Sequence, residues 1–210
     1  MKIFLSDFDG TLVNKDILDV LCSINGKEAE SKRLNEEFLA GRREGLPTLK
    51  QRIDFLSGVS YKQIYEKLEE NNYLIDGAYE LFEELKRRGV ITVLHSGNIT
   101  PVLRYYQEKL GISYIVGNKP RINNNIITGI ELSDFLGRDF KVLGCKKIIE
   151  QYNVQKNDII AIGDSPADLS VFQIAGTRIV INAKNDIEKE ADIVLNNSLV
   201  ELIPILDSIL

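Results

Sequence analysis

Short, nearly continuous apolar runs alternate with amphipathic segments along most of this 210-residue chain. The short apolar runs are typical of buried strands, whereas apolar residues spaced three and four apart indicate helices. We expect strands at residues 2–6, 90–98, 113–118, 178–182 and 191–195, and a strand that runs into a turn at 158–168. We expect helices at residues 76–89, 100–111, 141–154, 169–176 and 199–206. This alternation predicts a Rossmann-like α/β fold, a parallel sheet with helices on both faces.

One long stretch interrupts the alternation. From Lys15 to about Asn72 the sequence is charged and amphipathic, with helical spacing and no convincing strand. We therefore divide the chain into an α/β core, residues 1–14 and 73–210, and an inserted small helical cap, residues 15–72. A shorter departure lies at residues 119–132, where an asparagine-rich turn between β-prone runs predicts a hairpin.

Composition narrows the class of protein. The chain is 44% hydrophobic and 27% charged, which is typical of a soluble globular protein. No apolar run approaches the ~20 residues that span a bilayer, and the N-terminus lacks the basic start of a signal peptide, so we expect a cytoplasmic location. A net charge of −5 argues against nucleic acid as a partner. Cys22 and Cys145 form neither a disulfide framework nor a metal-binding pattern, and both are expected to be reduced.

Three of the expected strands end in polar or acidic residues, in "IFLSDFDGT", "ITVLHSGN" and "IIAIGDSPAD". Ligands of open α/β sheets bind at the carboxyl ends of the strands, so these termini can converge on one site. The site would hold Asp7, Asp9, Ser96, Asp164 and Asp168. Carboxylates this close repel one another unless a cation lies among them. Oxygen ligands without histidine or cysteine select a hard ion, so the expected metal is Mg²⁺.

Some of these residues also fit structural roles. The Asp-Gly pair at Asp9 is a strong hairpin signal, but helical spacing follows it instead of a partner strand. Asp164, which precedes a Ser-Pro pair, could cap a helix, and capping is compatible with metal binding. His95, the single histidine, adjoins Ser96, but adjacent strand residues point to opposite faces. We therefore expect His95 to be packed in the protein and not to act as a base for Ser96.

With these residues assembled, the sequence resembles the haloacid dehalogenase superfamily and, within it, the phosphoserine phosphatase-like branch. "DFDGT" is similar to the first motif, Ser96 in "HSGN" to the second and "GDSPAD" to the fourth. The third motif is a lysine at the start of the helix before the fourth. Lys141 matches that position, whereas Lys146 and Lys147 lie inside the helix and are expected on the surface. The insertion corresponds to the family's helical cap, so the resemblance covers nearly the whole chain.

The resemblance implies a phosphomonoesterase that forms an aspartyl-phosphate. Asp7 would be the nucleophile, and Asp9 would protonate the leaving alcohol and then deprotonate the attacking water. The implied holders of Mg²⁺ are the Asp7 carboxylate, the Asp9 backbone carbonyl and Asp164, supported by Asp168. The implied phosphate-binding groups are Ser96, Lys141 and backbone N–H groups near Gly97.

The substrate would be recognised by the cap. The resemblance places Asp16, one methylene shorter than the family's glutamate, where an acid meets the substrate amino group, and Arg52 where an arginine meets its carboxylate. Asp16 could instead be a helix-start residue favoured by the macrodipole, and Arg52 could instead pair with a cap glutamate. Leu49, Ile53 and Leu56 predict a buried stripe beside Arg52. The expected substrate is phosphoserine or a similar small phosphate that carries a carboxylate.

The chain departs from the family pattern at two positions, and two alternative functions stay open. Asn98 stands where the family usually has a second glycine, and Ala167 where it usually has asparagine. A phosphatase of another small metabolite, of the methionine-salvage type or acting on a sugar phosphate, would share the core and differ in the cap. A phospho-accepting binding module would need neither Asp9 nor a cap. We expect a small phosphorylated metabolite as partner, without nucleic acid or membrane, and the sequence leaves the oligomeric state and the pathway open.

Overall fold

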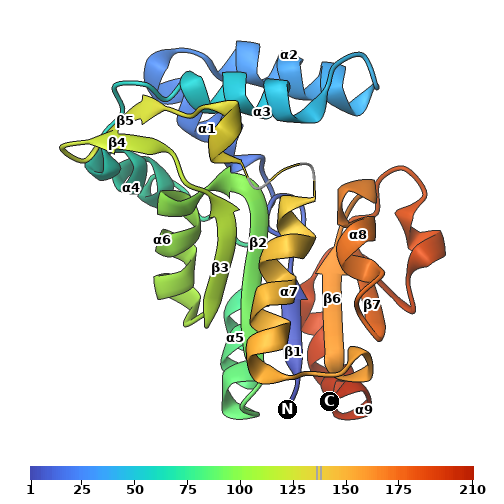
Figure 1. The fold of residues 1–210 in the computed structure, drawn as a ribbon. Coiled ribbons are helices and arrows are strands. Elements are labelled where there is room, and N and C mark those ends of the chain that lie inside the picture. Colours follow the sequence, from blue (N-terminus) through green and yellow to red (C-terminus); the bar gives the residue numbers. More distant parts are fainter. Residues whose placement is uncertain (136, 138) are drawn as a thin grey trace.

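The computed structural model describes residues 1–135, 137 and 139–210. Its centre is a six-stranded sheet in the order β3-β2-β1-β6-β7-β8 (Figure 1). The strands are β1 (Ile3–Ser6), β2 (Ile91–Ile99), β3 (Tyr114–Asn118), β6 (Ile159–Gly163), β7 (Thr177–Ile181) and β8 (Ile193–Leu195). Each neighbouring pair is parallel. The α/β fold predicted from the alternating pattern is therefore confirmed.

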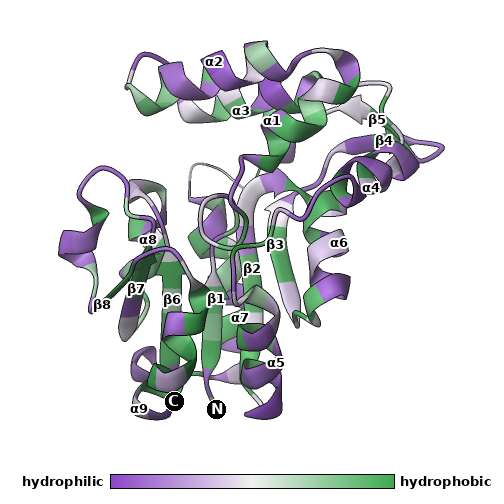
Figure 2. Ribbon diagram, turned by 180° about the vertical axis from the view of Figure 1, so that it is seen from behind, coloured by the Kyte–Doolittle hydropathy of each residue, from purple (hydrophilic) through white to green (hydrophobic). Residues whose placement is uncertain are grey.

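Helices cover both faces of the sheet, and their green apolar sides face the strands in Figure 2. One layer contains α5 (Ala78–Arg87), α6 (Thr100–Leu110) and α9 (Leu206–Ile209), and the other contains α7 (Phe140–Tyr152) and α8 (Leu169–Phe172). In β1, Phe4 packs in the first layer and its neighbour Leu5 in the second, because successive strand residues point to opposite faces. Short 3₁₀ turns occupy Ser23–Asn25, Leu132–Asp134, Lys156–Asp158, Pro166–Asp168 and Ile187–Glu190.

The end of the chain differs from the helix expected at residues 199–206. Leu199–Ile205 form a 3₁₀ helix, and α9 follows it. Pro204 lies inside the 3₁₀ helix, and proline has no N–H to donate to an α-helical ladder. The helix expected at residues 169–176 is also shorter, because α8 ends at Phe172.

The segment 15–72 is helical and lies over the carboxyl end of the sheet (Figure 1). Its helices are α1 (Ile17–Cys22), α2 (Glu28–Leu39), α3 (Gly45–Asp54) and α4 (Tyr61–Glu69). The expected hairpin is formed by β4 (Arg121–Asn123) and β5 (Ile126–Gly129), with Asn124 and Asn125 both at positive φ in the turn. The hairpin also bonds to the α3–α4 connection, where the backbone N–H of Gly58 donates to Ile127 O at 2.8 Å. The sequence pattern did not predict this contact.

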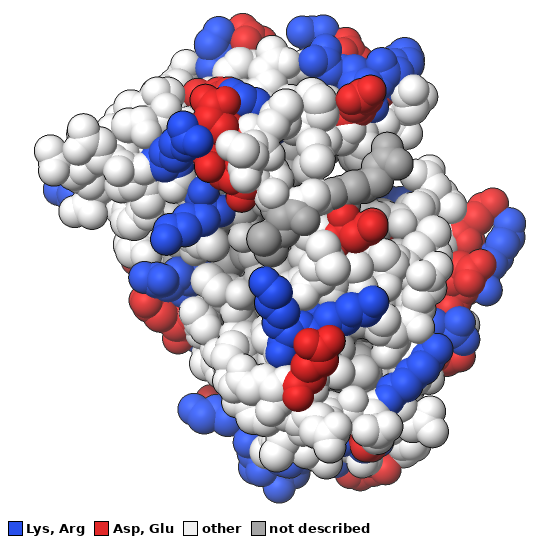
Figure 3. Space-filling model, in the orientation of Figure 1, with Lys and Arg blue, Asp and Glu red and all other residues white. Residues whose placement is uncertain are grey.

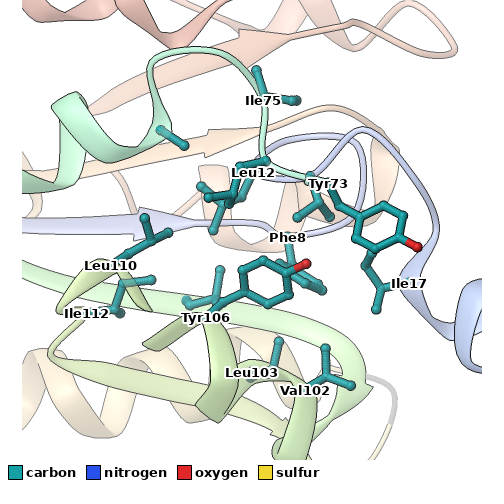
Figure 4. Close-up of a cluster of buried hydrophobic side chains, with 14 of the residues drawn as sticks. Phe8, Leu12, Ile17, Tyr73, Ile75, Val102, Leu103, Tyr106, Leu110 and Ile112 are labelled. Atoms are coloured by element: carbon teal, nitrogen blue, oxygen red, sulfur yellow. The ribbon is translucent and has the colours of Figure 1, made fainter. Parts of the chain in front are cut away.

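Phe8 anchors the loop that follows β1. Its ring is fully buried and lies 5.0 Å, centroid to centroid, from the ring of Tyr106 on α6. Figure 4 shows both rings within a cluster of apolar side chains. Because Phe8 points into this cluster, the aspartates on either side of it are held in fixed positions at the edge of the sheet.

The surface carries charged side chains of both signs (Figure 3). Within the described residues, no helix combines the length and the apolar character needed to cross a membrane. Lysine and arginine are interspersed with aspartate and glutamate over the face shown in Figure 3.

Candidate active site

A cavity of about 890 Å³ is lined by residues of both the cap and the carboxyl end of the sheet. The predicted site residues that line it are Asp7, Asp9, Asp16, Arg52, Ser96, Gly97, Lys141 and Asp164. Asp168 is buried beside it, where it accepts hydrogen bonds from Lys141 Nζ at 3.0 Å and from the backbone N of Asp164 at 3.3 Å. The structure therefore brings the whole predicted set together.

Asp7 directly follows β1 and is buried. Its backbone N–H donates to Ile162 O of β6 at 3.0 Å, which fixes the residue between two strand ends. Its Oδ1 accepts from Lys141 Nζ at 2.7 Å and its Oδ2 from Thr11 Oγ1 at 3.2 Å. Burial, followed by the charge of Asp168, holds the pKa of Asp7 well above its usual value, although Lys141 opposes the shift.

Asp9 has a different environment. Its Oδ1 accepts from the backbone N of Ile17 at 2.8 Å, and its Oδ2 accepts from Ser96 Oγ at 3.1 Å. Burial, followed by the nearby charge of Asp16, raises the pKa of Asp9 to about 7. A carboxyl group with a pKa near neutrality can both give and take a proton, so Asp9 is suited to acid and base roles.

Lys141 is the counter-charge of the buried acids. It lies in the first turn of α7, and its Nζ bonds to Asp7 Oδ1 at 2.7 Å and Asp168 Oδ1 at 3.0 Å. Burial favours a lower pKa for Lys141, but the charges of Asp168 and Asp7 outweigh it and raise the pKa overall. Asp7, His95 and Asp168 offer side-chain atoms within 4.8 Å of one another. Because the ammonium group already binds two of these residues, Lys141 balances the charge of this cluster.

Asp164 follows β6, and the loop after β1 packs directly against its carboxylate. Lys184 Nζ donates to Asp164 Oδ2, and the backbone N–H of Lys184 donates to Asp164 O at 2.8 Å. Gly10 has φ +93°, and a Cβ there would lie 2.0 Å from Asp164 Oδ2. Glycine is therefore required at position 10 by both its backbone conformation and this close approach.

The end of β2 contributes Ser96 and Gly97. Ser96 Oγ donates to Asp9 and accepts from the backbone N of Asn98 at 3.0 Å. The Gly97 carbonyl accepts from Asn118 Nδ2 at 2.6 Å, which ties this turn to β3. The two departures from the family pattern both lie here: Asn98 is buried, and Ala167 lines the cavity.

Arg52 in α3 is buried and bonded within the cap. Its Nη2 donates to Asp16 Oδ1 at 2.7 Å and Asp19 Oδ1 at 2.9 Å, and its Nε donates to Ser31 Oγ at 2.9 Å. The alternative prediction that Arg52 pairs with a cap glutamate is wrong. Its acidic partners are two aspartates, Asp19 in α1 and Asp16 at the N-cap of α1. Asp16 is also the N-cap of α1, where it accepts from the backbone N of Asp19.

Sequence reasoning missed several residues of the site. Lys184 follows β7, and its position at a strand's carboxyl end is a signal that could have identified it. Asp19 lies three residues after Asp16, so helical spacing predicts that both face the same side of α1. Asn35, whose Nδ2 donates to Asp16 Oδ2 at 3.1 Å, gave no recognisable signal. Lys146 and Lys147 are exposed, as expected.

The parallel sheet, the acid pair after its first strand and the helical segment above them place this chain among the α/β proteins whose site lies at the carboxyl ends of parallel strands. The family model described as haloacid dehalogenase-like hydrolase matches residues 4–173. The chain belongs to this family.

Individual relatives narrow the assignment. The chain is 30% identical over 192 residues to a phosphoserine phosphatase of Methanocaldococcus jannaschii, covering 91% of this chain and 90% of the relative. It is 29% identical over 196 residues to one of Campylobacter jejuni subsp. doylei, covering 93% and 94%. A solved phospho-aspartyl intermediate analogue of phosphoserine phosphatase has a TM-score of 0.84 and 28% identity, covering 97% of this chain and 98% of that one. The resemblance to the phosphoserine phosphatase-like branch is confirmed.

Proposed function

We propose that this hydrolase removes the phosphoryl group from phosphoserine, or from a similar small phosphate that carries a carboxylate, with Mg²⁺ as its cofactor. The observation that carries the proposal is that Asp7 and Asp9 line the same cavity but have different hydrogen-bond partners. Asp7 is bound by Lys141, while Asp9 has a pKa of about 7 and is bound by Ser96. Phosphoserine phosphatases among the relatives support the choice of substrate. The expected cytoplasmic location belongs to the same proposal and is tested by cell fractionation.

The residues around Asp164 fit a magnesium ion. The donors available are the carboxylates of Asp7 and Asp164 and the backbone carbonyl of Asp9, all of them oxygens, which Mg²⁺ prefers. A Cβ at Gly10 would meet Asp164 Oδ2 at 2.0 Å, so the glycine keeps the space beside this carboxylate oxygen, which Lys184 Nζ contacts, free of a side chain. Bound Mg²⁺ would neutralise charge on the phosphoryl oxygens.

In the proposed first step, an Asp7 carboxylate oxygen attacks phosphorus and the phosphorus–oxygen bond to the alcohol breaks. Asp9 gives its proton to the departing oxygen, which leaves as a neutral alcohol. Lys141 holds the Asp7 carboxylate through the 2.7 Å bond, and Ser96 and the N–H groups near Gly97 bind phosphoryl oxygens.

In the second step, water attacks the phosphorus of the aspartyl-phosphate. Asp9, now ionised, takes a proton from this water, and the bond between phosphorus and Asp7 breaks. The products are inorganic phosphate and the free Asp7 carboxylate. One side chain thus serves as acid and then as base, which is consistent with its pKa of about 7.

The cap supplies the proposed specificity. Arg52 lines the cavity, and its guanidinium group can bind a carboxylate through parallel hydrogen bonds, which lysine cannot do. Asp16 also lines the cavity and would meet the amino group of phosphoserine. Substrate binding would therefore exchange part of the Arg52–Asp16 contact for contacts to the substrate.

A panel of phosphate esters, assayed with and without Mg²⁺, tests the proposal. Phosphoserine should have the highest kcat/KM, and excess chelator should abolish its hydrolysis. A preference for a sugar phosphate or a methionine-salvage intermediate would reject phosphoserine while keeping the chemistry. Stable phosphorylation without turnover would instead favour a phospho-accepting module.

A further inference from the structure

His95 is a polar side chain in an apolar layer. It lies on β2 opposite Val116 of β3, is 0% exposed, and belongs to the face of the sheet that α7 covers. Within the described part of the chain, neither ring nitrogen has a hydrogen-bond partner. Its neighbour Ser96 bonds to Asp9, so the two side chains at the end of β2 diverge.

This arrangement is costly for folding. A buried nitrogen without a partner loses its hydrogen bonds to water and gains none in return. An apolar side chain of similar size would avoid that loss, as Val93 does two residues earlier on the same face. Buried polar groups without hydrogen-bond partners are concentrated at functional sites, where the reaction uses the group.

The ring faces the proposed nucleophile. His95 Nδ1 lies 4.0 Å from Asp7 Oδ1, the oxygen that Lys141 also binds. Burial, with Lys141 as the next cause, lowers the pKa of His95 to about 3, while Asp168 opposes the shift. A histidine ring carries an N–H donor whether it is neutral or protonated, so it can donate a hydrogen bond to Oδ1. A shift of about 1 Å would bring Nδ1 to hydrogen-bond distance from Oδ1.

We propose that His95 is a positioning residue for Asp7, whose carboxylate it orients by a hydrogen bond from Nδ1–H to Oδ1 when substrate binds. Such bonds often are long in the free enzyme and shorten in the complex. The end of β2 would then orient both acids, Asp7 through His95 and Asp9 through Ser96. This inference rests on the proposed role of Asp7 as nucleophile.

Three variants separate positioning from packing. His95→Asn places an amide N–H where Nδ1 lies, His95→Gln places one nearer to Nε2, and His95→Leu has neither. With an aryl phosphate and saturating Mg²⁺, we expect kcat of His95→Leu to fall about tenfold at unchanged KM, while its Tm stays equal or rises. His95→Asn should keep kcat within about threefold of the wild type, and His95→Gln should resemble His95→Leu.

Val116→Ala is the matched control, since it disturbs the same apolar layer without touching a polar atom. It should lower Tm and leave kcat unchanged. The proposal is overturned if His95→Leu keeps wild-type kcat, or if kcat and Tm fall together in all three variants. Equal kcat for His95→Asn and His95→Gln would also overturn it, and this comparison holds even if His95→Leu does not fold. A wild type that hydrolyses no phosphate ester would overturn both this inference and the proposed function.

Discussion

Asp7 and Asp9 are two residues apart, yet their surroundings give them different chemistry. The buried ring of Phe8 fixes the loop, so that Asp7 faces Lys141 and Asp9 faces Ser96 and the start of α1. Burial raises the pKa of both carboxyl groups. The difference lies in the partners: the ammonium group of Lys141 opposes the rise in the pKa of Asp7, whereas Asp9 accepts hydrogen bonds from two neutral donors, Ser96 Oγ and Ile17 N.

The first prediction concerns this pair. Asp7→Asn should lower kcat at least about a thousandfold, because an amide does not replace the nucleophilic carboxylate. Asp9→Asn should be nearly as damaging, since it removes the proton carrier. Initial rates with phosphoserine and an aryl phosphate measure the loss, and circular dichroism checks that the fold is kept. Substantial turnover by purified Asp7→Asn protein would rule out the aspartyl-phosphate mechanism.

The second prediction concerns Gly10. Gly10→Ala should strain the backbone and displace Asp164, so Mg²⁺ affinity should fall about tenfold or more and Tm should decrease. Gly41→Ala is the matched control, because Gly41 also has positive φ, +70°, but a Cβ there meets nothing within 4 Å. It should lower Tm alone. Calorimetric titration with Mg²⁺ distinguishes the two, and equal affinities in both variants would refute the role given to Gly10.

Among the elements, α3 is the cap helix that places Arg52 at the cavity. Ile53 and Leu56 are fully buried, as the apolar stripe predicts, whereas Leu49, the third residue of the stripe, is half-buried and lines the cavity. Arg52 lies beside this stripe with three hydrogen-bond acceptors from α1, its N-cap and α2. The charges of Asp16 and Asp19 outweigh burial and raise the pKa of Arg52. This helix therefore presents a permanently charged guanidinium group that is held in place before substrate arrives.

The third prediction follows from this geometry. Arg52→Lys should lower kcat/KM for phosphoserine roughly 10–100-fold, because lysine cannot form two parallel hydrogen bonds to a carboxylate. Hydrolysis of an aryl phosphate, which offers no carboxylate, should change little. Arg43→Lys, just before α3, is the control and should affect neither substrate. Equal losses of kcat/KM for both substrates in Arg52→Lys would show that Arg52 supports the cap and does not bind the substrate carboxylate.

For the whole molecule, the carboxyl edge of the sheet concentrates acids that two lysines only partly balance. Asp7, Asp164 and Asp168 are buried there, bonded by the partly buried Lys141 and the exposed Lys184. The net charge of −5 increases the attraction for a cation. Metal binding should therefore stabilise the folded state as well as support turnover.

The fourth prediction tests this coupling. Mg²⁺ at one hundred times its Kd should stabilise the protein by about 2.7 kcal/mol, seen as a rise in Tm, and excess chelator should abolish activity reversibly. Asp164→Ala should lose most of the Tm rise, because it removes a proposed ligand. Full activity in excess chelator would contradict the role of the metal.

Local patterns were enough to predict much of this architecture. Short apolar runs, glycine stops and the asparagine turn are signals contained within a few residues, and they predicted the strands, the hairpin and most helices. The rule that ligands bind at the carboxyl ends of parallel strands extended this reasoning to Asp7, Ser96 and Asp164, which lie far apart in sequence. The rule works because all parallel strands end at the same edge.

Contacts between distant segments could not be obtained in this way. The pairing of Arg52 with Asp19, the bond from Lys184 to Asp164 and the approach of His95 to Asp7 each depend on how two elements pack. The same holds for the hairpin against the α3–α4 connection. No periodicity along the chain encodes these distances, because they follow from side-chain packing and charge balance across the folded molecule.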